Sequence, residues 1–335
     1  MSTGSLKLLT ARRFAPLFMT QFLSAFNDNL FRTALVTFIT YQTVVLSQDE
    51  RSWFVTLSLG LFVLPFFIFS ATAGQLADKY CKAKLIRIVK FCEVLVMALA
   101  VVCFSLQNPY LLLLVLFLVG TQSALMTPVK YSILSEHLKQ EELIGGNGLI
   151  EASTFIAILI GTILGGLFYS VGGTAILIGV PLVLISAVCG FAISQFIPGT
   201  GPANPEQRID KDIIHVTYQV VKEVAEKPHL FRLVLGISWF WLLGSVILSQ
   251  IANFSADVIH GTTGVFSYLL ILFSISLGIG SVLCPYVTSG KVTAKYLPIS
   301  CLFISVFLFD TAYLGSHYAQ LNMPMNLNTF LSLPM

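Results

Sequence analysis

The basic residues of this chain alternate with long apolar runs in a way that few folds allow. All but two of the 19 Lys and Arg residues lie in five gaps between apolar runs, and the exceptions are Arg32 and Arg51. Positive residues stay on the cytoplasmic side of short loops when a chain inserts into a membrane. The pattern therefore predicts a multi-pass membrane protein with a cytoplasmic N-terminus. The basic gaps are residues 7–13, 79–90, 130–139, 208–232 and 291–295.

The composition excludes several classes of protein. The chain is 56% hydrophobic and 10% charged, whereas soluble domains carry roughly 25% charged residues. The net charge of +3 is too small to indicate nucleic-acid binding. The six cysteines form no CxxC pair, which argues against a disulfide framework and a zinc site. We therefore expect no metal and no cofactor.

About nine segments are long and apolar enough to span a bilayer, which requires about 20 residues per helix. They lack the two-residue alternation of barrel strands, so the expected fold class is all-α transmembrane. The expected spans are residues 14–46, 53–76, 84–106, 109–129, 144–170, 174–197, 230–257, 264–288 and 296–315.

The spacing of these segments predicts three parts. Residues 1–197 are expected to form an N-terminal six-helix bundle, and 198–228 a charged cytoplasmic linker with an amphipathic helix near 209–227. Residues 229–335 then hold three spans of a partial C-terminal bundle. Transporters built from two six-helix halves have this layout. A complete second half would need three more spans, so we expect a fragment of a longer chain.

The first span carries charged and polar residues near its middle. Asp28 and Arg32 lie four residues apart and share a helix face, with Asn27 and Asn29 beside them. Charges at this depth are costly and normally face a cavity or a partner. Two readings remain open, a structural ion pair within the helix and a binding site for a headgroup or a proton.

Further candidates lie on other spans. Lys130 follows the fourth span and is either a substrate ligand or a residue that snorkels to the interface. Glu151 lies about two turns into the fifth span, where an acid indicates function. The seventh span offers Gln250, between Ser249 and Asn253. Glycines of the fifth span predict close packing against another helix, and they are Gly161, Gly165 and Gly166.

The loop after the second span reads GQLADKYCKAK. It resembles the signature loop of the major facilitator superfamily, although Cys81 stands where that pattern has Gly. We expect Gly74 to allow a close helix approach, Asp78 to meet a helix N-terminus or a basic partner of the other half, and the lysines to contact lipid headgroups. These lysines are Lys79, Lys82 and Lys84.

Longer strings resemble one family within that superfamily. QFLSAFNDN, PVKYSIL and NGLIEASTFIAILIGTILGG are similar to the lysophospholipid transporter family, and specifically to its membrane domain that is sometimes fused to a phospholipid acyltransferase and an acyl-carrier-protein synthetase. The resemblance implies that Asp28 and Lys130 hold a zwitterionic headgroup. It also implies that lysophosphatidylethanolamine moves from the outer to the inner leaflet of the inner membrane, where acyl-transfer enzymes restore its second chain.

Two alternatives come from other classes. The same fold could serve a proton-coupled exporter of small solutes or drugs. An acyltransferase needs a His followed five residues later by an Asp, and none of the five His residues has one; His137 comes nearest, with Glu142 at that offset. We therefore expect no catalytic residues in this segment, and any fused enzyme would lie beyond Met335.

Overall fold

The computed structural model consists of helices joined by turns and loops in the residues it describes, which are 4–41, 47–170, 175–199, 201–202, 204–206, 209–210, 212–289, 291, 293–319 and 326–332. The long helices of this part correspond in order to the expected spans. They are α2 (Ala15–Tyr41), α3 (Gln48–Lys79), α4 (Lys82–Ser105), α5 (Pro109–His137), α6 (Leu143–Ser170), α7 (Ala175–Ser194), α9 (Pro228–Asn253), α10 (Thr263–Val287) and α11 (Leu297–Ala319).

Short elements connect or precede these helices. They are α1 (Gly4–Lys7), the 3₁₀ turn η1 (Leu8–Thr10), α8 (Ile213–Ala225), the π-helical turn η2 (Phe254–Val258) and α12 (Leu327–Leu331). Among the described residues, seven helices are long and apolar enough to cross a membrane: α3, α4, α5, α6, α9, α10 and α11. The count of about nine spans, which would add α2 and α7, stays a prediction.

Local sequence signals set several helix boundaries. Ser47 and Glu50 form a reciprocal capping box that begins α3, which satisfies two backbone N–H groups that have no partner within the helix. Asn108 caps α5, and Pro109 occupies its first turn. α5 does not end near residue 129, as the sequence had indicated, but continues to His137. Lys130 is therefore part of the helix and not of the following loop.

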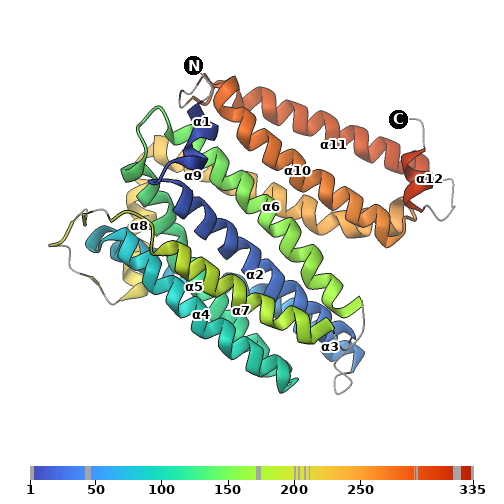
Figure 1. Ribbon diagram of the computed structural model, residues 1–335. Helices are drawn as coiled ribbons and strands as arrows, with labels where there is room; N and C mark the ends of the chain where they lie inside the picture. Colours follow the sequence, from blue (N-terminus) through green and yellow to red (C-terminus); the bar gives the residue numbers. More distant parts are fainter. Residues whose placement is uncertain are drawn as a thin grey trace.

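α2 lies at the centre of the first six long helices. It packs against α6 and α7, while α5 packs against α3 and α4. Figure 1 shows α9, α10 and α11 on the side of α6 away from α4, and α10 makes the main contact with α6. A buried apolar cluster holds α2 against α4 and α5, with Phe104 packed edge-on to Phe31 and Phe38.

Two glycines of α6 bring it close to α2. A Cβ at Gly161 would lie 2.5 Å from the Phe26 carbonyl oxygen, and one at Gly165 would lie 2.7 Å from that of Leu30. The close packing expected there is confirmed. The expectation was wrong for Gly166, and the close approach expected at Gly74 is also absent, because a Cβ at either position would have nothing within 4 Å.

The helix expected in the linker is present as α8, and Asp212 caps its start with a side chain that accepts from the His215 N–H. α8 packs against α3 and α9. Val216 is buried, whereas Ile214 and Tyr218 are exposed. Residues 200, 203, 207–208 and 211 of the linker lie outside the described residues.

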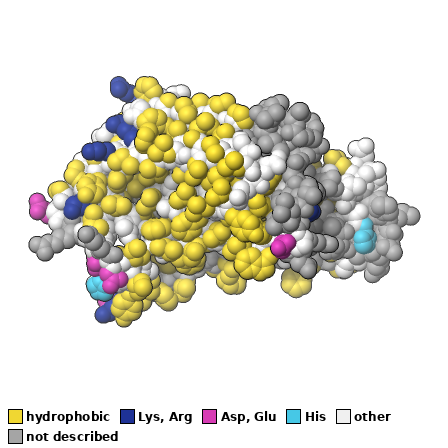
Figure 2. Space-filling view, turned by 90° about the horizontal axis from the view of Figure 1, so that it is seen from below, with side chains coloured by type: hydrophobic (Ala, Val, Ile, Leu, Met, Phe, Trp, Pro, Cys, Tyr) yellow, Lys and Arg dark blue, Asp and Glu magenta, His cyan; other side chains and the backbone are white. Residues whose placement is uncertain are grey.

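Basic side chains from the turn before α2 and from the start of α4 lie at one end of the helices. The Arg13 guanidinium donates to the His137 carbonyl at 2.8 Å and to Glu142 at 2.7 Å. Arg87 donates to the Ile197 carbonyl at 2.9 Å, and Lys82 forms an ion pair with Glu136. Figure 2 shows a broad hydrophobic face with most of its visible Lys and Arg side chains at one end. This distribution suits a molecule surrounded by lipid along its length.

Candidate functional site

Asp28 is buried between α2 and α5, and neutral groups bind its carboxylate. Gln122 Nε2 donates to Asp28 Oδ1 at 3.1 Å, and Ser123 Oγ donates to Oδ2 at 2.5 Å. Only 8% of the residue is exposed. Among the described residues, no ion pair includes Asp28. A ligand with a positive group can therefore form an ion pair with Asp28.

Arg32 does not form the ion pair that its spacing from Asp28 allows. Its guanidinium donates to Asn29 Oδ1 at 2.8 Å and lies 5.5 Å from the centroid of the Phe62 ring on α3. Asn29 in turn donates to the carbonyl of Ala25 at 2.8 Å. The structural ion pair considered for this helix is thus replaced by a cation–π contact and a hydrogen bond.

Lys130 lies on the same face of α5 as the groups that bind Asp28. It follows Ser123 by seven residues, which is about two helical turns and roughly 10 Å along the axis. The side chain is 7% exposed, and its ammonium lies 4.4 Å from the centroid of the Tyr131 ring. The described ion pairs do not include Lys130. An acid and a base, each without a charged partner in an ion pair, thus lie along one helix face.

Glu151 and Gln250 have different surroundings. Glu151 of α6 accepts a hydrogen bond from the Tyr131 hydroxyl at 2.6 Å, which places it near Lys130 in the α5–α6 region. Gln250 is exposed on α9. The side chains of Ser249 and Asn253 lie outside the described residues.

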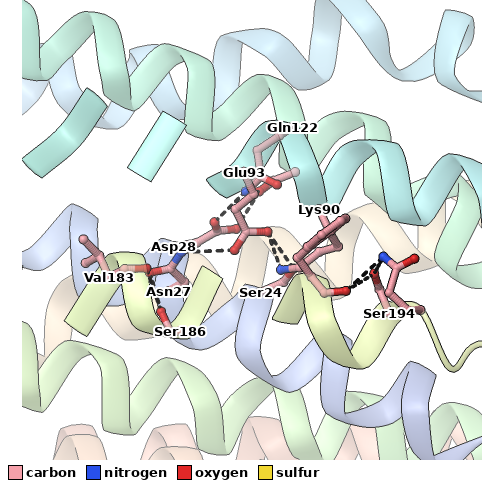
Figure 3. A network of polar contacts seen from close by, with 12 residues as sticks. Ser24, Asn27, Asp28, Lys90, Glu93, Gln122, Val183, Ser186 and Ser194 are labelled. Carbon is pink, nitrogen blue, oxygen red and sulfur yellow. Dashed lines mark hydrogen bonds and ion pairs between the residues drawn. The ribbon is translucent and has the colours of Figure 1, made fainter. Parts of the chain in front are cut away.

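A buried polar network that the sequence did not predict lies directly beside Asp28 (Figure 3). Lys90 and Glu93 of α4 form an ion pair, and both side chains are fully buried. Asn27 Nδ2 donates to Glu93 Oε1 at 3.0 Å, and Ser186 Oγ of α7 donates to Asn27 Oδ1 at 2.8 Å. Lys90 also donates to Ser24 Oγ at 3.0 Å. The network joins α2, α4 and α7.

One sequence signal could have revealed this pair. Lys90 and Glu93 lie three residues apart and so share a helix face. Lys90 ends the basic gap of residues 79–90, and Glu93 lies within the expected span of residues 84–106. Among the described residues, no group of three or more His, Cys, Asp or Glu side chains is arranged to hold a metal ion.

Comparison with known proteins places the chain in a family. A sequence model of the Major Facilitator Superfamily matches residues 17–333. The chain belongs to this superfamily. It is similar to the lysophospholipid transporter LplT of Citrobacter koseri, with 28% identity over 322 residues, covering 94% of this chain and 76% of that protein.

Two further relatives of the same name match shorter parts of the chain. That of Serratia proteamaculans is 34% identical over 195 residues, covering 58% of this chain and 46% of that protein. That of Klebsiella pneumoniae is 30% identical over 227 residues, covering 67% of this chain and 53% of that protein. These two alignments span about half of each relative's length. The resemblance found in the sequence is confirmed.

The superfamily's signature loop contributes structural contacts. Lys82 is buried in its ion pair with Glu136 of α5, so the expectation that it contacts lipid headgroups was wrong. Lys84 is exposed, and the Lys79 ammonium lies 5.9 Å from the centroid of the Tyr80 ring. The Asp78 side chain is exposed, while its carbonyl accepts from the Asn204 N–H at 2.8 Å. A gating role for the loop stays a prediction.

Proposed function

We propose that this protein transports lysophospholipids across a membrane by alternating access. The observation that carries the proposal is the pair of buried charges, Asp28 and Lys130, along the face of α5 that meets α2. Neither has a charged partner in a described ion pair. The similarity to proteins named lysophospholipid transporters, which extends over 94% of the chain in one case, supports the same conclusion. Relatives of this kind favour a transporter over an enzyme.

The headgroup chemistry matches these side chains. A zwitterionic headgroup such as phosphoethanolamine offers a phosphate for Lys130 and an ammonium for Asp28. Asn29, Arg32, Glu151 and Gln250 are the remaining residues of the proposed substrate site, whereas Asn27 has both ends of its amide bound by Glu93 and Ser186. The signature-loop residues Gly74, Asp78, Lys79, Lys82 and Lys84 would act in gating. A ligand that neutralises both buried charges removes part of their burial cost.

The proposed topology follows from the basic end of the molecule. Residues 1–197 form the six-helix bundle, 198–228 the cytoplasmic linker and 229–335 the partial second bundle, with nine spans in all. Arg13 precedes α2, Lys82 and Arg87 lie in the first two turns of α4, and all three make their contacts at the ends of helices. The N-terminus would then face the cytoplasm, and the membrane would be the inner membrane.

The proposed direction is from the outer to the inner leaflet. An acyltransferase and an acyl-carrier-protein synthetase, fused to this chain or associated with it, would then add the second acyl chain. That reaction would trap the lipid and remove the need for a coupled ion. The substrate is therefore a lysophospholipid with one chain, and the product of transport is consumed by an acyl transfer.

Proteoliposomes test the proposal. Fluorescent lysophosphatidylethanolamine is placed in one leaflet, and its transfer is followed with a quencher that does not cross the membrane. We expect transfer by the wild-type protein, and a loss of about tenfold or more in Asp28→Ala, since a charge-assisted contact contributes about 1.5–3 kcal/mol. Glu141→Gln, an exposed acid in the α5–α6 loop, is the matched control.

The outcomes separate the candidate functions. Wild-type transfer no faster than in protein-free vesicles would show that the proposed substrate is wrong. Export of a small cationic solute driven by a proton gradient, without lipid transfer, would favour the exporter. Equal transfer by the wild type and Asp28→Ala would leave the transporter in place and refute the site.

A further inference from the structure

The Lys90–Glu93 network holds a single side chain of α2 at both ends of its amide. Glu93 Oε1 accepts from Asn27 Nδ2 at 3.0 Å, and Ser186 Oγ donates to Asn27 Oδ1 at 2.8 Å (Figure 3). Asn27 is fully buried. Because both ends of a planar amide are bound, by α4 on one side and α7 on the other, the side chain cannot turn without breaking a buried hydrogen bond.

Asn27 directly precedes Asp28, the acid of the proposed substrate site. Successive residues of an α-helix point about 100° apart around its axis. With Asn27 fixed between α4 and α7, Asp28 is directed toward Gln122 and Ser123 of α5. The rotation of α2 about its own axis is thus tied to the two hydrogen bonds of Asn27.

The second face of α2 is fixed in a different way. Gly161 and Gly165 of α6 bring the two backbones together near Phe26 and Leu30. Contacts between glycines and a neighbouring backbone set the distance between two helices, but they include no hydrogen bond that would favour one rotation of α2 about its axis. The polar network therefore adds a constraint that the glycine contact lacks.

The charges of the pair have a specific use in this arrangement. An ionised carboxylate only accepts hydrogen bonds, whereas a protonated one also donates. Lys90 forms its ion pair with Oε2 of Glu93, which leaves Oε1 as an acceptor for Asn27. An apolar pair of similar volume could stabilise the bundle equally well, but it would leave the Asn27 amide without its acceptor.

α7 is shaped to admit the basic member of the pair. A Cβ at Gly190 would lie 2.8 Å from both Cε and Nζ of Lys90. Only glycine therefore fits opposite this side chain as it is placed. The pair also lies between the two apolar clusters of the bundle, one containing Ile86 and Val89 and the other Met97 and Ala100.

We propose that Lys90 and Glu93 form a positioning pair, which holds Asn27 and thereby directs Asp28 toward the substrate headgroup. The pair does not touch the substrate. This inference rests on the proposed function, because it names the residues that orient its binding acid. It gives a role to Lys90 and Glu93, two buried charged residues that are not part of the proposed substrate site.

Two uncharged double variants separate positioning from folding. Lys90→Met with Glu93→Gln removes both charges but keeps an amide oxygen that accepts from Asn27. Lys90→Met with Glu93→Leu removes the charges and the acceptor. We expect the first to keep a KM for lysophosphatidylethanolamine close to that of the wild type, and the second to raise it about tenfold, the cost of one unsatisfied buried donor. Transport is normalised to folded protein by size-exclusion chromatography.

A third variant covers the case in which the leucine variant does not fold. Ser186→Ala removes the other hydrogen bond of Asn27 and leaves both charges in place. We expect it to raise the KM in the same direction by a smaller factor, with the maximal rate nearly unchanged. Unchanged KM in Ser186→Ala, or equal KM in the two double variants, would overturn the positioning role.

A measurement without substrate keeps this inference separate from the proposed function. Asp28→Cys is made in the wild type and in each double variant, and labelling of the introduced thiol is followed by site-resolved mass spectrometry. We expect the glutamine variant to label like the wild type and the leucine variant to label at a different rate. Equal rates in all three would refute the positioning pair, whether or not the wild type moves lysophospholipid.

Discussion

The two sides of α2 bury charge in opposite ways. Toward α4 and α7, Lys90 and Glu93 neutralise each other, and Ser24 and Asn27 complete their hydrogen bonds. Toward α5, the Asp28 carboxylate has hydrogen bonds only from Gln122 and Ser123 among the described residues. On the first side, the two charged groups are paired with each other and hydrogen-bonded within the protein, and we call this the closed side. On the second side, Asp28 has hydrogen bonds from neutral groups and is in none of the described ion pairs.

This difference indicates which charges can serve a ligand. A buried ion pair that loses one member leaves the other uncompensated, at a cost of about 3–5 kcal/mol, so Lys90 and Glu93 cannot be released for binding. Asp28 and Lys130 are in none of the described ion pairs. A ligand with a positive and a negative group would supply a counter-charge to each, while the closed side keeps the helices in place.

Breaking the closed side should have the largest effect. In Lys90→Ala, Glu93 keeps only its contacts with Ser24 and Asn27, and we expect a loss of about 3–5 kcal/mol in the free energy of unfolding. Thermal unfolding and the folded fraction in size-exclusion chromatography measure it. Lys84→Ala, an exposed lysine of the same helix, should change stability by less than about 0.5 kcal/mol. Similar losses in the two variants would remove the contrast between the sides.

Changing Asp28, on the side of α2 that faces α5, should affect transport more than stability. Asp28→Asn can still accept from Gln122, so the fold is expected to persist. Its transport of lysophosphatidylethanolamine should fall about tenfold or more, because a charge-assisted contact contributes about 1.5–3 kcal/mol. Lysophosphatidylglycerol, which has the phosphate but no amine, should be transported as by the wild type.

Lys130→Met completes this comparison from the phosphate end. Its transport of both lipids should fall by a similar factor, because both carry the phosphate that the ammonium would bind. Lys139→Met, at an exposed position of the α5–α6 loop, is the control. Equal effects of Asp28→Asn on the two lipids would contradict the assignment of Asp28 to the amine.

The sequence predicted the helices better than it predicted the partners of the charges. Apolar run length and basic gaps located all the long helices, and α8 was expected within four residues of its observed start. The end of α5 was placed too early because the apolar run stops near residue 129, although a helix can extend beyond its apolar segment. Lys90 was missed because a basic residue near a helix start is usually solvated.

The partners themselves depend on tertiary packing. Arg32 had a favourable spacing to Asp28, yet it contacts Asn29 and the Phe62 ring of a different helix. Ser186 lies 159 residues from Asn27, and Gln122 lies 94 residues from Asp28. Serine and glutamine are common in apolar helices, where they often bond to their own backbone. Only the arrangement of α2, α4, α5 and α7 identifies which of them complete the site.

The glycine contact of α2 should show an effect of intermediate size. In Gly165→Ala the new Cβ would lie 2.7 Å from the Leu30 carbonyl oxygen, so backbones must separate, at a cost of about 1–3 kcal/mol. Gly166→Ala meets nothing within 4 Å and should be neutral or stabilise by up to about 1 kcal/mol. Thermal unfolding of the two neighbours compares them directly. Equal destabilisation by Gly165→Ala and Gly166→Ala would show that the close contact at Gly165 is not the cause of its loss.

The smallest effect is expected at the exposed ion pair between Arg13 and Glu142. The hydrogen bond from Arg13 lowers the pKa of the Glu142 carboxyl below its ordinary value. A lowered folded-state pKa contributes stability at neutral pH, which is lost as the pH falls through the ordinary carboxyl range toward the lowered value. The side chains are 38% and 28% exposed, so solvent screening limits the contribution to about 0.2–1 kcal/mol. Glu142→Gln should therefore melt slightly below the wild type at neutral pH, and the difference should disappear in acid. Water can replace a lost partner at this partly exposed pair but not at the buried Lys90–Glu93 pair. A loss of stability as large as that of Lys90→Ala would therefore contradict the difference that burial is expected to make.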